Sequence, residues 1–144
     1  MVRRIVIASV VLTLVASGAA LAATRDMGMG TYVNLHMESG VGNVLATASG
    51  RTLYLNTIDG KNTINCKATC ASGWPPLYTT SKPLAGMGVK QSLLHTTKRP
   101  NGKLQVTYNG HPLYRYSGDT KAGQANGEGS GGRWFAVTAA GNKK

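Results

Sequence analysis

The chain has 144 residues, with 16 lysines and arginines against five aspartates and glutamates, and a formal net charge of +11. This length predicts one ordinary domain and excludes two once an N-terminal export signal is removed. The basic excess predicts attraction to anionic surfaces. The absence of a basic helix, or of a basic stripe interleaved with aromatic residues, argues against nucleic-acid binding.

The first 22 residues have the pattern of a signal peptide. Arg3 and Arg4 form a positive n-region, an uncharged apolar run follows at 5–16, and Ala20-Leu21-Ala22 is a small-x-small cleavage pattern. The run is shorter than the roughly 20 residues of a membrane span, and no cysteine lies near the cleavage site for lipid attachment. We expect cleavage after Ala22 and a soluble periplasmic or secreted protein, which meets the membrane only through its transient signal helix.

Residues 23–40 are expected to form a flexible N-terminal segment. The segment is a candidate copper site, since thioether and imidazole groups suit that metal. The alternative is a tail without a metal, in which Val33, Leu35 and Met37 dock as an edge strand. The candidate copper ligands are Met27, Met29, His36 and Met37.

Residues 41–140 are predicted to form a single β domain with two repeats, at about 42–77 and 102–137, before a basic tail at 141–144. A shift of 60 residues aligns the repeats without a gap and gives eight identities. Tyrosine and tryptophan are rare in this chain, so the matches at these residue types are the strongest evidence for the repeat. The identical positions of the first repeat are Gly42, Thr47, Gly50, Leu53, Tyr54, Asp59, Lys61 and Trp74.

Turn signals divide each repeat into short strands. Ser49-Gly50 and Asn109-Gly110 each separate two strand-like runs, and Asn-Gly is the stronger hairpin signal because both of its residues take positive φ. With 19 glycines in the chain and no helical periodicity after the signal helix, we expect an all-β fold. That fold is a small antiparallel sandwich or barrel of two pseudo-equivalent hairpin-based repeats. The expected strands are 44–48, 51–55, 92–98, 104–108 and 111–116.

Three stretches carry a specific combination of motifs. They are Tyr54 with Asp59, the Cys-x3-Cys-x3-Trp-Pro-Pro-Leu run at 66–77, and the run at 106–119, which contains Tyr-Asn-Gly-His-Pro-Leu-Tyr. Together they resemble the bacterial "secreted repeat of unknown function" family, predicted lipoproteins with a Tyr-x-aromatic-x-x-Asp motif, over roughly 40–138. Asn56 departs from the aromatic position of the first motif, and the lipid-attachment cysteine of many relatives is missing. The resemblance implies the fold class and no settled activity.

Cys66 and Cys70 are expected to form a disulfide in an oxidising compartment. A thioredoxin-like pair has two intervening residues rather than three, and structural zinc would need further ligands nearby. The second repeat has Asn126 and Ser130 at the matching positions. The disulfide therefore belongs to the first repeat alone.

Each repeat combines a strand tyrosine with a later aspartate, Tyr54 with Asp59 and Tyr114 with Asp119. One interpretation is structural: the ring fills the core and the carboxylate accepts backbone N–H groups in the next turn. The other is a groove in which exposed rings stack on a sugar or flat ligand and a carboxylate fixes its hydroxyls. Alternation places Tyr114 and Tyr116 on one face of their strand, buried or exposed. The candidate binding residues are Tyr114, Tyr116, Asp119 and Trp134.

Three functions remain open. The leading one is a noncatalytic, envelope-associated binding or structural module that holds an anionic polymer, a glycan or a partner protein. The second is periplasmic copper handling or a redox-linked role, although the sequence requires no cofactor. The third is an enzyme of unknown type acting through Tyr114, Asp119 and His111. No catalytic residue is assigned, because acids are few, the three histidines are dispersed and no Gly-x-Ser-x-Gly elbow is present.

Overall fold

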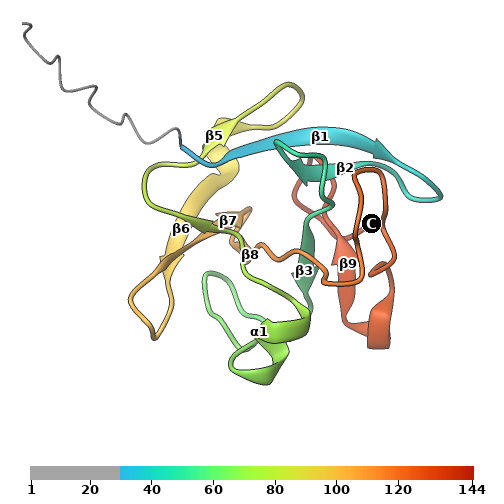
Figure 1. Ribbon diagram of the computed structural model, residues 1–144. Coiled ribbons are helices and arrows are strands. Elements are labelled where there is room, and N and C mark those ends of the chain that lie inside the picture. Colours follow the sequence, from blue (N-terminus) through green and yellow to red (C-terminus); the bar gives the residue numbers. More distant parts are fainter. Residues whose placement is uncertain (1–29) are drawn as a thin grey trace, which may run out of the picture.

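The computed structural model describes residues 30–144, which fold into short strands with one short α-helix (Figure 1). This confirms the all-β class, while the expected signal helix lies outside the described residues. Two 3-10 turns, Gln91–Leu93 and Ser130–Gly132, complete the elements. In chain order these are β1 (Tyr32–Glu38), β2 (Gly42–Thr47), β3 (Tyr54–Asn56), α1 (Thr69–Gly73), β4 (Tyr78–Thr79), β5 (Leu84–Ala85), β6 (Leu94–Lys98), β7 (Leu104–Tyr108), β8 (His111–Pro112) and β9 (Trp134–Ala136).

The strands form three small sheets, and residues 30–144 contain no closed barrel. One sheet has the order β2-β1-β5, a second pairs β3 with β9, and the third has the order β4-β7-β6 with β8 also on β7. Pairing is antiparallel except between β1 and β5. The sequence therefore predicted the all-β class correctly. Of the two expected architectures, a sandwich or a barrel, the closed barrel is absent from this part of the chain.

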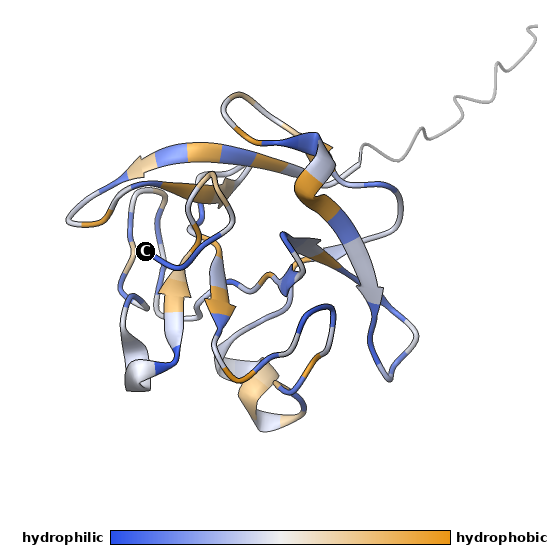
Figure 2. Ribbon diagram, turned by 180° about the vertical axis from the view of Figure 1, so that it is seen from behind, coloured by the Kyte–Doolittle hydropathy of each residue, from blue (hydrophilic) through white to orange (hydrophobic). Residues whose placement is uncertain are grey.

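Part of the segment expected to be flexible, Tyr32–Glu38, forms the strand β1. β1 lies between β2 and β5, so it is a central strand rather than an edge strand. Hydropathy alternates along it in Figure 2, with Val33 fully buried and Leu35 half-buried on the core side. The predicted basic tail is also paired, because the backbone N–H of Lys144 donates to the Ala136 carbonyl at 2.9 Å.

The hairpin predicted around Asn109-Gly110 is present. Asn109 and Gly110 have φ values of 50° and 81°, the left-handed conformation that joins β7 to β8. The predicted third strand is β6, paired antiparallel with β7. In the first repeat the corresponding hairpin is short. The Leu53 N–H donates to the Leu45 carbonyl at 2.8 Å, and the chain then turns away from β2 and enters β3.

Strands of the two repeats pair with each other. In β3 and β9, Tyr54 of the first repeat is opposite Ala136 of the second, and the matching bridge joins Tyr114 of the second repeat to Pro76 of the first. At the centre, Tyr54 and Tyr114 exchange two backbone hydrogen bonds, each 2.9 Å long. The repeats are thus related by an approximate twofold axis, and neither completes its own strand pairing.

An aromatic cluster lies on this axis. The indole rings of Trp74 and Trp134 are stacked, with centroids 3.9 Å apart and an interplanar angle of 2°. Tyr54 meets Trp74 edge-on at 5.4 Å, and Tyr114 meets Trp134 in the same way at 5.1 Å. Such pairs stabilise a fold by about 0.5–1.5 kcal/mol each beyond area burial. The cluster holds the repeats together from inside, beside a separate aliphatic core.

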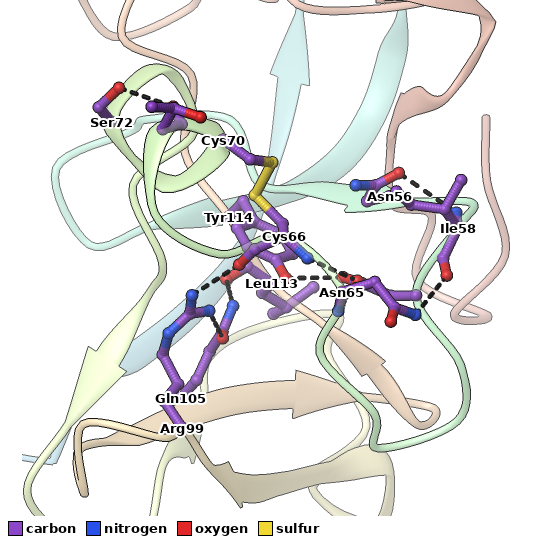
Figure 3. Close-up of a disulfide and its surroundings, with 12 residues drawn as sticks. Asn56, Ile58, Asn65, Cys66, Cys70, Ser72, Arg99, Gln105, Leu113 and Tyr114 are labelled. Carbon is purple, nitrogen blue, oxygen red and sulfur yellow. Dashed lines mark hydrogen bonds between the residues drawn. A yellow bond between two sulfur atoms is a disulfide. The ribbon is translucent and has the colours of Figure 1, made fainter.

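The expected disulfide joins Cys66 to Cys70 with a Cα–Cα distance of 5.3 Å, across the start of α1 (Figure 3). Its loop is tied to both repeats. The Cys66 carbonyl accepts a hydrogen bond of 2.6 Å from the buried guanidinium of Arg99, which also donates to Gln105 at 2.7 Å. The disulfide thus fixes one end of a polar network that reaches β7.

The Cys66→Ala/Cys70→Ala variant is expected to lose about 2 kcal/mol of unfolding free energy, because the loop closed by the disulfide is short and restricts the unfolded chain modestly. Urea denaturation followed by tryptophan fluorescence measures this loss. Wild-type protein kept in reductant should show the same midpoint as the double variant. A double variant as stable as the oxidised wild type would contradict the expectation.

Candidate functional site

Each motif tyrosine donates to the aspartate of the other repeat. Tyr54 Oη donates to Asp119 Oδ2 at 2.6 Å, and Tyr114 Oη donates to Asp59 Oδ2 at 2.6 Å. Both tyrosines are fully buried. Burial, and then the hydrogen-bonded carboxylate, raise the pKa of each hydroxyl far above its ordinary value, so that both remain proton donors. The Tyr–Asp motif therefore joins the repeats to each other.

The second oxygen of each aspartate organises a loop. Asp59 Oδ1 accepts the backbone N–H groups of Asn65 at 2.7 Å and Cys66 at 3.3 Å. Asp119 Oδ1 accepts the matching N–H of Asn126 at 2.8 Å. The expected structural role, in which the carboxylate binds the following turn and the ring fills the core, is present. The exchange of hydroxyl partners between repeats was not foreseen.

Three of the four residues expected around a stacking groove, Tyr114, Tyr116 and Trp134, pack in one aromatic cluster, whereas Asp119 binds Tyr54. Tyr114 is fully buried, Trp134 is 6% exposed and Asp119 is 7% exposed. Tyr116 is half-buried and stacks on Trp74 with centroids 4.4 Å apart. Gly127 permits this packing, because a Cβ there would lie 2.7 Å from the Trp74 ring. These rings therefore pack mainly against one another.

The candidate copper ligands are only partly within the described chain. Met27 and Met29 lie outside residues 30–144. His36 and Met37 are exposed neighbours on β1 and therefore project from opposite faces of the strand. Across residues 30–144, no group of three or more histidine, cysteine, aspartate or glutamate side chains is arranged to hold a metal ion.

The residues considered for catalysis separate into two places. Asp119 is bound to Tyr54, whereas Tyr114 is bound to Asp59. His111 lines a small cleft together with Asp59. An enzyme acting through Tyr114, Asp119 and His111 would need these side chains to converge in one pocket, and they do not, because the aspartates are exchanged between the repeats.

Glu38, at the end of β1, was not singled out by sequence. It is 1% exposed, and within residues 30–144 neither carboxylate oxygen has a hydrogen-bond partner. Burial raises its pKa, the nearby Asp119 carboxylate raises it further, and His36 and the Thr52 hydroxyl oppose the rise. An unpaired carboxylate in this position favours the protonated form and costs stability when it ionises.

A cleft that brings two arginines together is formed between the two repeats. It has a volume of about 510 Å³, and its lining combines two guanidinium groups with several hydroxyls. We call it the arginine cleft. One wall comes from the first repeat and the other from the segment and turn that follow β8. Its lining residues are Ser49, Arg51, Thr52, Pro75, Arg115, Tyr116, Ser117, Asp119 and Thr120.

Comparison with known proteins finds a match for part of the chain. Residues 95–138 match a family model described as a secreted repeat of unknown function. They contain the second motif, with Tyr114 and Asp119. Searches of curated proteins and of solved structures found no match. In the described part of the chain, no helix is both long and apolar enough to cross a membrane.

The second repeat uses its motif differently from the first repeat. Tyr116, the aromatic position of the motif, reaches across to Trp74. Asn56 stands at the matching place in the first repeat, where it is 2% exposed and its Oδ1 accepts the Ile58 N–H at 3.2 Å. Asn56 thus closes its own turn. The departure noted in the sequence makes the two sides of the molecule chemically unequal.

The Glu38→Gln variant is expected to gain stability over wild type as pH rises from about 4 to about 7. With a pKa raised in the folded state, wild type binds more protons folded than unfolded over this window, so its unfolding free energy falls as pH rises. Glutamine removes that loss. Comparing the two proteins by urea denaturation across this range isolates the effect from other carboxylates.

Glu128→Gln is the matched control, because Glu128 Oε2 already accepts the Ala136 N–H at 2.6 Å and its replacement should give no such gain. A stability difference between Glu38→Gln and wild type that does not change with pH would contradict the assignment of Glu38 as an unpaired buried acid.

Proposed function

We propose that the protein is an exported, noncatalytic module that binds phosphate or carboxylate groups of an anionic envelope polymer at the arginine cleft. The proposal rests on Arg51 and Arg115, which share one cleft with hydroxyl-bearing side chains. A guanidinium presents its donors in a planar fork that matches two oxygens of a phosphate or carboxylate. Two such groups at one cleft favour an anionic ligand over a neutral one.

The acid in the lining is already engaged. Asp119 accepts from Tyr54 through one oxygen and from the Asn126 N–H through the other. Its backbone carbonyl accepts from the Arg51 guanidinium, which fixes that side chain at the cleft wall. Arg115 is exposed. With two arginines and one aspartate, the lining carries a net charge of +1.

The floor and wall of the cleft are rigid before any ligand arrives. Tyr116 is held by its stack on Trp74, and the Ser117 N–H donates to the Gly73 carbonyl at 3.0 Å. Side chains held in place by packing lose little conformational entropy when a ligand binds. A preorganised cleft wall therefore supports binding by a domain of this small size.

The charge of the whole chain acts in the same direction. Outside the expected signal peptide there are 14 lysines and arginines against five acids. Such an excess attracts anionic polymers over distances of about a Debye length, roughly 10 Å at 0.1 M salt. This long-range term speeds association, while the arginine cleft supplies a defined place of contact.

Replacing Arg115 with glutamine is expected to weaken binding at least about tenfold, since a charge-assisted hydrogen bond contributes roughly 1.5–3 kcal/mol. The measurement is fluorescence anisotropy with two labelled polymers, linear polyphosphate and polygalacturonate, which separate phosphate from carboxylate recognition. Wild-type affinity should also fall as salt is raised.

Lys82→Gln is the matched control, because it removes one positive charge from an exposed residue that lines neither the arginine cleft nor the cleft that contains Lys98. Two results would overturn the proposal. One is a loss of affinity in Lys82→Gln equal to that in Arg115→Gln, which would show diffuse attraction to net charge. The other is wild-type affinity that does not depend on salt.

A further inference from the structure

A second cleft lies at the position related to the arginine cleft by the approximate twofold axis. Its volume is about 290 Å³, and we call it the histidine cleft. Five of its lining positions correspond, at a shift of 60 residues, to Arg115, Tyr116, Ser117, Asp119 and Arg51 of the arginine cleft. The histidine cleft is lined by Leu55, Asn56, Thr57, Asp59, His111, Asn142 and Lys143.

The two clefts share a backbone framework. The Thr57 N–H donates to the Arg133 carbonyl at 2.9 Å, as Ser117 donates to Gly73 at 3.0 Å. The N–H of Asp59 donates to the Asn56 carbonyl at 3.0 Å, and the N–H of Asp119 donates to the Tyr116 carbonyl at 3.1 Å. Equivalent turns of the two repeats therefore form the two clefts.

The cationic groups differ in kind. His111 takes the position of Arg51, and Leu55 takes that of Arg115. A second cation enters from the C-terminal residues instead: Lys143 lies over the Phe135 ring, with Nζ 4.6 Å from its centroid. With neutral His111 the lining charges of Lys143 and Asp59 cancel. Protonation of His111 gives the histidine cleft the net charge of +1 that the arginine cleft carries permanently.

The surroundings of His111 hold it in the neutral form near neutral pH. It is half-buried, and burial lowers its pKa while the neighbouring Asp59 carboxylate opposes that shift. Asp59 is bound on its other side by Tyr114, and Lys143 shares the cleft. The Lys61 side chain packs against the adjoining turn residue Gly110. An anion in the cleft would favour the imidazolium.

We propose that the histidine cleft is a second anion-binding site, which binds phosphate or carboxylate groups when His111 is protonated and releases them when it is neutral. The ligand class rests on the proposed function, while the equivalence of the two clefts stands without it. The module then holds an anionic polymer at two points in an acidic medium and at one point otherwise. Two linked contacts strengthen binding far beyond either one alone.

The test is an NMR titration of the mature protein with sulfate, whose charge is constant between about pH 5 and about pH 7.5, at fixed ionic strength. Backbone amides of Thr57 and Lys143 report the histidine cleft, and those of Ser117 and Thr120 report the arginine cleft. We expect sulfate to bind the histidine cleft at least about tenfold more tightly at the lower pH. The arginine cleft should change little.

Two substitutions separate charge from shape. His111→Arg restores the cation of the arginine cleft and should bind sulfate at Thr57 and Lys143 equally at both pH values. His111→Gln should bind weakly at both. The second-site proposal is overturned if His111→Arg keeps the wild-type pH dependence, or if wild type binds equally at both pH values. Saturable shifts at Thr57 without any at Ser117 would instead refute the arginine cleft and support the histidine cleft.

Discussion

The hydrogen bond from each buried motif tyrosine to the aspartate of the opposite repeat is the constraint on which the rest of the structure depends. Tyr54 is satisfied by Asp119 and Tyr114 by Asp59. A buried hydroxyl without its acceptor would cost about 1–3 kcal/mol, so neither repeat is complete alone. Because each carboxylate also binds the turn that follows it, the same contact that joins the repeats fixes the loops at the molecular surface.

The clefts are a consequence of this exchange. Each combines the motif turn of one repeat, containing Asp59 or Asp119, with the residue after the hairpin turn of the other, His111 or Arg51. The geometry that the two clefts share comes from the Tyr–Asp contact and the stacked tryptophans. The lining residues outside that framework are free to differ, and they do: two arginines on one side, a histidine and a lysine on the other. A symmetric scaffold thus presents two unequal surfaces.

Features set by neighbouring residues were predictable from sequence, and those set by distant ones were not. Asn109-Gly110 determines its hairpin locally, and Cys66 and Cys70 are close enough in sequence to pair without further information. The shift of 60 revealed the repeats, but periodicity cannot say whether an aspartate serves its own repeat or the other. Burial of Tyr114 and Trp134, the meeting of Arg51 with Arg115, and the unpaired Glu38 all depend on chain crossings between segments far apart in sequence. The alternation of β1 indicated at most an edge strand, because its second partner, β5, lies far along the chain.

Native-state hydrogen exchange at increasing denaturant tests the central claim, that the repeats form one cooperative unit, most directly. The amides of Leu53 and Leu113, whose hydrogen bonds to the Leu45 and Val106 carbonyls each lie within one repeat, should both exchange at the free energy of global unfolding. Exchange of Leu53 through a smaller opening, while Leu113 remains protected, would show that one repeat unfolds without the other and would contradict the account.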